Sequence, residues 1–150
     1  MTEAKVSVII PTLNAGATLS KCLDSVIAQT HSNVEILILD ALSRDDTAAI
    51  ATDYKQRYSR VRFWSEQDAG IYDAMNKGIS RATGDWLYFL GADDELSSSS
   101  VLQDLSAYFL PGVDLIYGNI RRMTKNAVEG GSFDHGRLMH SNICHQAILY

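Results

Sequence analysis

Carboxylates follow three apolar segments of this 150-residue chain, and they are the groups best suited to chemistry. The pair Asp93-Asp94 comes directly after the apolar run Trp86–Leu90, and Asp40 and Asp68 follow two earlier runs. Adjacent carboxylates at the end of a buried strand repel each other unless a cation or strong donors lie between them. Hard divalent ions such as Mg²⁺ or Mn²⁺ bind carboxylate and phosphate oxygens together. The pattern therefore predicts a metal site that also takes a phosphate-bearing ligand.

Simpler explanations of these groups stay open at this point. The aspartate pair, with Glu95, could cap the next helix or face solvent, and Asp40 could be a turn residue that starts a helix. Gly70 would let the backbone approach a ligand closely, but a glycine before a helix is common. A lone histidine such as His145 is more often a core or surface residue than a ligand-binding one.

Short apolar runs alternate with amphipathic stretches of helix length, and this pattern predicts the elements that position the carboxylates. The predicted strands are Val6–Ile10, Val34–Leu39, Val61–Trp64, Trp86–Leu90 and Val113–Tyr117. Asn14 is expected to cap a first helix, and Asp45 or Asp46 a second one. The predicted helices are the stretch that carries Leu19, Leu23, Val26 and Ile27, and then Thr47–Tyr58, Ile71–Ala82 and Val101–Phe109.

Strands and helices in this alternation predict an α/β fold, with a mostly parallel, Rossmann-like sheet and helices on both faces. In such sheets, ligands bind in the crevice outside the carboxyl ends of the strands, where the carboxylates lie. After Gly118 the pattern changes to irregular antiparallel structure over Asn119–Val128 and Gly130–Phe133, and His140–Tyr150 returns to an apolar strand. Since the last residues are apolar, we expect a fold truncated at its C-terminal side.

Composition argues against several classes of protein. The formal net charge is −5, and no cluster of basic residues exceeds Arg121-Arg122, so nucleic-acid binding is not expected. The phosphate-binding Gly-x-x-x-x-Gly-Lys loop, paired Cys-x-x-Cys motifs and the Gly-x-Ser-x-Gly elbow are all missing from the sequence. No signal peptide or membrane-spanning run is recognised, so a cytoplasmic location is expected by default.

Six segments resemble family 2 glycosyltransferases with the GT-A fold, of the bacterial type that builds polysaccharides. The resemblance runs from about Val6 to the last residue, and the motifs occur in the family's order. They are Ser7-Val-Ile-Ile-Pro-Thr-Leu-Asn14, Asp40-x-x-Ser43-x-Asp45-x-Thr47, Asp68-Ala-Gly-Ile-Tyr-Asp-Ala-Met-Asn-Lys-Gly78, Ala82-Thr-Gly-Asp85, Phe89-Leu-Gly-Ala-Asp-Asp94 and Cys144-His-Gln146.

The resemblance implies a nucleoside-diphosphate-sugar donor, with uridine as the common base, and a divalent metal, Mn²⁺ or Mg²⁺. Asp94 would be the direct metal ligand, and Asp93 would contact the metal and the ribose. The donor-binding set that it implies is Pro11, Thr12, Asn14, Asp40, Asp68, Gly70, Asp93 and His145. The chain departs from the family at Ala41 and Leu42, where members often have an acidic residue or glycine.

By the same resemblance, residues 1–118 would form the donor-binding core and residues 119–150 the start of the acceptor side. The sugar would pass with inversion to a glycan or lipid-linked acceptor, in synthesis of cell-surface polysaccharide. The catalytic base would lie beyond residue 150, so none is named. Peripheral association of the parent protein with the inner face of the membrane is a further expectation, and the oligomeric state is not predicted.

Two alternatives stay open. A nucleotidyltransferase would also use an α/β sheet with carboxylates and Mg²⁺, but it would need a basic, glycine-rich loop after the first strand. The segment Pro11–Gly16 carries no basic residue. The second alternative is a non-catalytic fragment that binds nucleotide sugars without transferring them.

Overall fold

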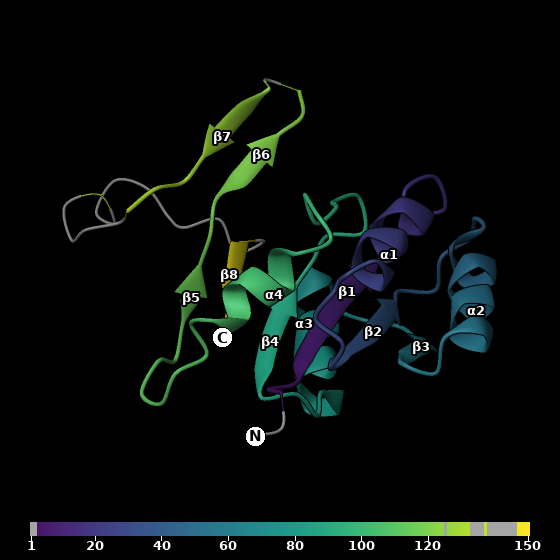
Figure 1. Ribbon diagram of the computed structural model, residues 1–150. Helices are drawn as coiled ribbons and strands as arrows, with labels where there is room; N and C mark the ends of the chain where they lie inside the picture. The colour runs from purple at the N-terminus through teal and green to yellow at the C-terminus, as the bar shows by residue number, and fades with distance from the viewer. Residues whose placement is uncertain (1–2, 125, 133–136, 138–146) are drawn as a thin grey trace.

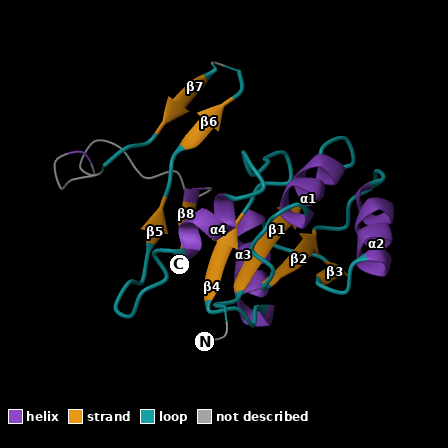
Figure 2. Ribbon diagram, viewed as in Figure 1, coloured by secondary structure: helices purple, strands orange, loops and turns teal. Residues whose placement is uncertain are grey.

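The computed structural model describes residues 3–124, 126–132, 137 and 147–150 (Figures 1 and 2). Its helices are α1 (Leu19–Ile27), α2 (Thr47–Arg57), α3 (Ile71–Arg81) and α4 (Val101–Ser106). Its strands are β1 (Val6–Thr12), β2 (Val34–Asp40), β3 (Val61–Ser65), β4 (Trp86–Phe89), β5 (Ile116–Tyr117), β6 (Ile120–Arg122), β7 (Ala127–Glu129) and β8 (Ile148–Leu149).

Six strands form one sheet in the order β3-β2-β1-β4-β8-β5. The first four strands in the chain pair in parallel, while β8 runs antiparallel to both β4 and β5. The predicted mostly parallel sheet is therefore confirmed. The expected strand His140–Tyr150 lies partly outside the described residues, and only Ile148–Leu149 of it is seen as a strand.

Two predicted elements are three residues shorter in the structure. The helix expected over Val101–Phe109 ends at Ser106, because the amides of Tyr108 and Phe109 bond to carbonyls three residues back and so tighten the last turn. The strand expected over Val113–Tyr117 begins only at Ile116.

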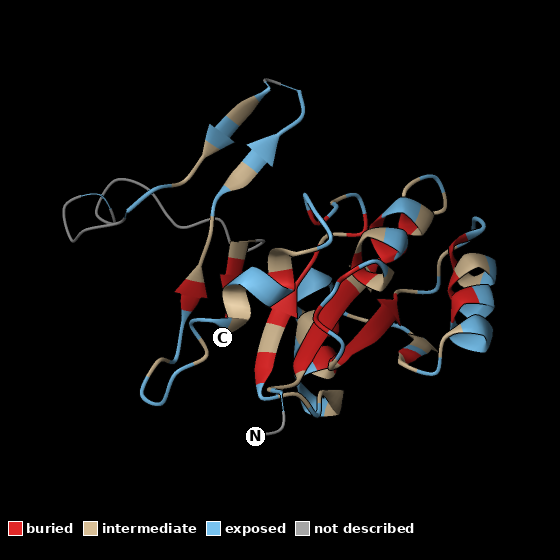
Figure 3. Cartoon of the chain, in the orientation of Figure 1, coloured by how far each residue is buried: buried red, intermediate tan, exposed pale blue. Residues whose placement is uncertain are grey.

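Helices cover both faces of the sheet, as expected. On α1, Leu19, Cys22, Leu23 and Val26 recur at the spacing of one helix face, and all four are fully buried. They join residues of α2 and α4 over one face, whereas Ala74 and Met75 of α3 pack over the other. The central strands are buried on both faces, as Figure 3 shows, which explains why their sequences are almost continuously apolar.

A buried carboxylate ties the strands together at their amino ends. Glu35 on β2 is 3% exposed and accepts hydrogen bonds from Ser7 Oγ at 2.6 Å, Thr83 N at 2.6 Å and Lys5 Nζ at 3.0 Å. Burial alone would raise the pKa of Glu35, but these bonds outweigh it and lower the pKa to about 2. The group joins β1, β2 and the segment before β4 at the edge opposite the predicted site.

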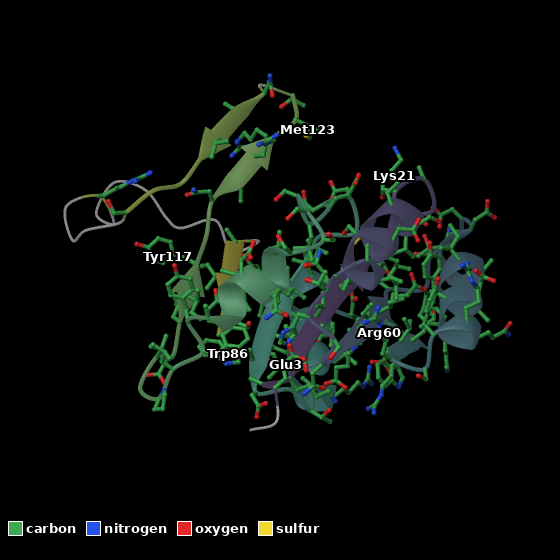
Figure 4. All side chains as sticks on the ribbon, viewed as in Figure 1. Glu3, Lys21, Arg60, Trp86, Tyr117 and Met123 are labelled. Atoms are coloured by element: carbon green, nitrogen blue, oxygen red, sulfur yellow. The ribbon has the colours of Figure 1, made fainter. Side chains whose placement is uncertain are left out.

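The hairpin of β6 and β7 stands apart from the sheet and extends beyond the edge where β1 and β4 end (Figure 1). Met123, at the turn of the hairpin, is 85% exposed and lies at the end of the hairpin that is far from the sheet (Figure 4). Among the described residues, every helix is too short or too polar to span a lipid bilayer.

Candidate functional site

The strand register brings the predicted residues to one edge of the sheet. Thr12, Asp40 and Ser65 are paired across β1, β2 and β3, so they form a row at the carboxyl ends of these strands. On the other side of β1, Phe89 pairs with Ile9, and the chain continues into the Asp93-Asp94 segment. The loops that follow all four strands therefore leave the sheet at the same edge, the upper one in Figure 1.

Asp40 is enclosed by hydroxyl and amide donors and is 2% exposed. Its Oδ1 accepts hydrogen bonds from Thr12 Oγ1 at 3.3 Å and from the Ser43 hydroxyl. Its Oδ2 accepts from Ser65 Oγ at 2.6 Å and from Ser43 N at 3.1 Å. The carboxylate thus joins the carboxyl ends of β1, β2 and β3, and a contact between Asp40 and a nucleotide stays a prediction. Ser65 was not singled out from the sequence, since one hydroxyl at a strand end gives no distinct signal.

Replacing Asp40 with asparagine is expected to lower the free energy of unfolding by about 1–2 kcal/mol, since the amide nitrogen cannot accept the bonds made to one carboxylate oxygen. Urea denaturation would measure the change. Asp53→Asn is a suitable control, because Asp53 is exposed and its ion pair is a surface contact with Arg57 on the same helix. Equal stability of the two variants would contradict the role given to Asp40.

The prediction that Asn14 caps the first helix is wrong. Helix α1 begins at Leu19, five residues later, with Thr18 at the capping position. Asn14 has a φ of 50°, which asparagine tolerates better than most residues. Its side-chain Oδ1 accepts a hydrogen bond from Arg44 N at 2.9 Å, and its backbone N–H donates one to Ser43 Oγ at 2.8 Å. Asn14 therefore joins the loops after β1 and β2 instead of capping a helix.

Asp45 makes a second connection between these two loops. Its Oδ2 accepts from Gly16 N at 2.8 Å, and its Oδ1 accepts from the amide and hydroxyl of Thr47 at the start of α2. Bonds from the Thr47 hydroxyl and the Gly16 amide lower the pKa of Asp45. Of the two caps proposed for this helix, Asp45 makes the side-chain bond, while Asp46 makes none.

Pro11 and Thr12 form the end of β1. Thr12 is buried and bonded to Asp40, and Pro11 is half-buried beside Leu39 of β2. The side-chain contacts of this strand end are therefore internal, whereas Leu13, the next residue, is 61% exposed. Nucleotide contacts of Pro11, Thr12 and Asn14 stay predictions.

The loop after β3 is shaped by its own hydrogen bonds. Asp68 Oδ1 accepts from Gly70 N at 2.9 Å, and Asp73 Oδ2 accepts from Ala69 N at 3.0 Å. Gly70 has a φ of 117°, a conformation that favours glycine, and its Cα faces open space. This backbone conformation is sufficient to explain a glycine here, so a ligand role for Asp68 and Gly70 stays a prediction.

The Asp93-Asp94 pair lies in a tight turn, closed by a 3.0 Å bond from Asp94 N to Gly91 O. Asp93 is exposed and Asp94 half-buried. Contrary to the expectation from the sequence, burial therefore does not force a cation between the two carboxylates, because solvent reaches the turn and screens their repulsion. The turn is near Cys22 of α1, whose Sγ is 3.4 Å from Gly91 O. Burial and the negative charges of Asp94 and Asp93 raise the pKa of Cys22 to about 12, so it stays a neutral thiol.

The turn can offer a divalent ion one or two carboxylates, so the remaining ligands of the ion would have to come from elsewhere. Within the residues that the structure describes, no group of three or more His, Cys, Asp or Glu side chains could hold a metal ion, so Asp40 does not complete a site with the pair. Mg²⁺ and Mn²⁺ bound with phosphates need only one or two carboxylates, since water and phosphate oxygens supply the other ligands. The pair, with Asp93 exposed and Asp94 half-buried, is compatible with that arrangement. His145, with its neighbours Cys144 and Gln146, lies outside the described residues.

Comparison with known proteins relates this site to a family. The sequence model described as "Glycosyl transferase family 2" matches residues 7–142. A "PGL/p-HBAD biosynthesis glycosyltransferase" of Mycobacterium bovis is 43% identical over 148 residues, which are 96% of this chain and 58% of that relative. The chain thus spans about three fifths of the length of this relative.

Two solved structures resemble the fold. The mannosyltransferase PcManGT from Pyrobaculum calidifontis, in complex with GDP-Man and Mn²⁺, has a TM-score of 0.72 at 21% identity, over 81% of this chain and 36% of its own. S. aureus TarS 1-349, in complex with UDP-GlcNAc, has a TM-score of 0.64 at 25% identity, over 69% of this chain and 30% of its own. These likenesses confirm the GT-A type of sheet expected from the sequence.

Proposed function

The chain belongs to glycosyl transferase family 2. We therefore propose that it binds a nucleoside-diphosphate sugar at the carboxyl edge of its sheet, with a UDP-sugar as the first candidate. The sugar would pass, with inversion, to a glycan or lipid-linked acceptor in synthesis of cell-surface polysaccharide. The observation that carries this proposal is the turn Gly91–Asp94, because its adjacent carboxylates follow β4 at the edge where β1 and β2 also end.

The carboxylates of Asp94 and Asp93 would hold a divalent ion, Mn²⁺ or Mg²⁺. When bound, such an ion supplies positive charge that offsets the negative charge of a departing nucleoside diphosphate. Pro11, Thr12 and Asn14 would border the base, and Asp40 would keep the ends of three strands in place beneath it. Two hydrogen bonds between Asn14 and residues 43–44 support this, since they hold the β1 and β2 loops together as one rim.

We propose that residues 1–118 form the donor-binding core and that residues 119–150 begin the region that binds the acceptor. The hairpin of β6 and β7 supports the second assignment, because it extends beyond the edge of the sheet where the donor would bind (Figure 1). A cytoplasmic location, at the inner face of a membrane, also remains a prediction.

No general base is assigned within the described residues. Asp73 is bonded to Ala69 N and pairs with Lys77 at 3.1 Å, and these contacts lower its pKa. Asp85 accepts from Lys5 N at 2.8 Å, at the opposite edge of the sheet. Donor binding and sugar transfer are therefore separate proposals, and a turnover assay would distinguish a transferase from a chain that only binds the donor.

A thermal-shift screen tests donor binding. With Mn²⁺ present, UDP or a UDP-sugar at one hundred times its dissociation constant should raise the melting temperature by roughly 5–10 °C, because a ligand that binds only the folded chain stabilises it. GDP, ADP and inorganic phosphate serve as comparisons, and EDTA removes the metal. If no nucleoside diphosphate shifts the melting temperature more with Mn²⁺ than with EDTA, the proposed function is incorrect.

A further inference from the structure

The segment Gly91–Ser100 contains no helix or strand, yet α1 and the residues after it hold the segment along its length. Such a segment needs partners for its backbone groups, because no sheet or helix supplies them. The partners of these backbone groups lie at Cys22, Ser25, Gln29 and Thr30, which are spaced along one side of α1 and its C-terminal extension.

Ser25 holds the aspartate turn on its C-terminal side. Its hydroxyl donates its one proton to Cys22 O at 2.7 Å, and its oxygen accepts from Leu96 N at 3.1 Å. On the other side of the turn, Gly91 O is 3.4 Å from Cys22 Sγ. Residues three apart on a helix are neighbours, so a single helical turn contacts the chain just before and just after Asp93-Asp94.

Gln29 holds the rest of the segment. It is 6% exposed, and its amide nitrogen donates to Ser98 O at 2.6 Å and to Ser25 O at 3.0 Å. Its amide oxygen accepts from Leu102 N at 3.0 Å, at the start of α4. The two partners of the amide nitrogen are carbonyl oxygens, and the partner of the amide oxygen is an N–H group. Only this orientation of the side-chain amide therefore makes all three hydrogen bonds.

The same helix also continues the loop after β1. The amides of Thr18 and Leu19 bond to Ala15 O, and Ala15 N donates to Thr47 Oγ1 at 2.8 Å. Helix α1 therefore connects the loop proposed to border the base with the turn proposed to hold the metal. A displacement of either end would change the distance between the two.

We propose that Ser25 and Gln29 are positioning residues, which hold the Asp93-Asp94 turn in register with the β1 loop so that one metal-bound nucleoside diphosphate can contact both. This inference rests on the proposed function. Neither residue touches the ligand in this proposal. Their contribution should appear in the part of nucleotide affinity that depends on the metal.

The test compares UDP binding by calorimetry with Mn²⁺ and with EDTA. Ser25→Ala and Gln29→Leu should each weaken Mn²⁺-dependent affinity about ten-fold, as is typical when support for a metal ligand is lost. The affinity in EDTA should change less than two-fold. Ser25→Thr, which keeps the hydroxyl, should restore most of the metal-dependent affinity. If Gln29→Leu does not fold, the two Ser25 variants carry the test.

Tyr54→Phe is the matched control. Tyr54 Oη bonds to Asp24 Oδ1 at 2.6 Å and attaches α1 to α2, so its loss weakens the packing of α1 without touching Gly91–Ser100. Should this control lose as much Mn²⁺-dependent affinity as Ser25→Ala, the two residues have only a general structural role and the inference is overturned. A wild-type chain that binds UDP equally with Mn²⁺ and EDTA would instead overturn the proposed function, and this inference with it.

Discussion

Replacing Asp94 with alanine is expected to abolish the Mn²⁺-dependent binding of a nucleoside diphosphate to this chain. The turn carries two carboxylates and Asp94 is the proposed direct ligand, so its loss removes the main oxygen donor that the protein offers the ion. The Mn²⁺-dependent affinity is expected to fall by at least about 100-fold. Removing a residue that only holds a metal ligand in place costs up to about 100-fold, so losing the ligand itself should cost at least as much. Calorimetric titration of UDP, with Mn²⁺ and with EDTA, measures it.

Glu95→Gln is the control for this experiment. Glu95 is the next residue along, it is exposed, and with Asp94 and Asp93 it contributes to the negative potential at Cys22. The control therefore removes one negative charge from the same segment without removing the proposed ligand. Metal-dependent affinity that is unchanged in Asp94→Ala, or reduced equally in Glu95→Gln, would rule out Asp94 as the metal ligand.

Acid should destabilise the fold through Glu35. Its pKa is about 2 in the folded chain, below the ordinary value of 4.5, so the ionised form stabilises the fold above pH 4.5. That contribution is lost as the pH falls from 4.5 through 2. The lowering of the Glu35 pKa from 4.5 to about 2 corresponds to about 3 kcal/mol of unfolding free energy. Urea denaturation at a series of pH values from 7 to 2 measures the loss.

Glu35→Gln isolates this contribution. Glutamine cannot ionise, so the variant should be less stable than wild type at pH 7, and the difference should shrink by about 3 kcal/mol as the pH falls to 2. Other carboxylates with lowered pKa, such as Asp45 and Asp73, titrate in both proteins and cancel in the comparison. A difference in stability that does not vary with pH would show that Glu35 contributes little through its charge.

Much of the fold was predictable because its strands are buried on both faces. Val6–Ile10 and Val34–Leu39 are apolar apart from one residue each, Ser7 and Glu35, as is typical of central parallel strands, and the observed strands end within two residues of the predicted ends. The edge was harder. Only Ile116–Tyr117 of the strand expected over Val113–Tyr117 forms, and this strand lies at the edge of the sheet, beside the two-residue strand β8.

The candidate site was predictable in position but not in its internal contacts. Carboxylates that follow parallel strands must share an edge, so Asp40 and Asp93-Asp94 could be placed there from their spacing. Ser43 supplies two of the four bonds to Asp40, but the other two come from Thr12 and Ser65, which are 28 and 25 positions away and reach Asp40 only in the folded sheet. Asn14 illustrates the same limit, because a capping residue and a loop connector have the same local sequence.

The sequence by itself determined the α/β class, the order of the elements and the edge of the sheet at which the carboxylates gather. Each of these depends on local periodicity and on the rule that parallel strands share a direction. Only the tertiary structure decided that the aspartate turn is open to solvent and that Ser25 and Gln29 hold the segment around it. Hydrogen bonds between residues about 70 positions apart leave no trace in local spacing, because they form only once the sheet has brought α1 beside the turn.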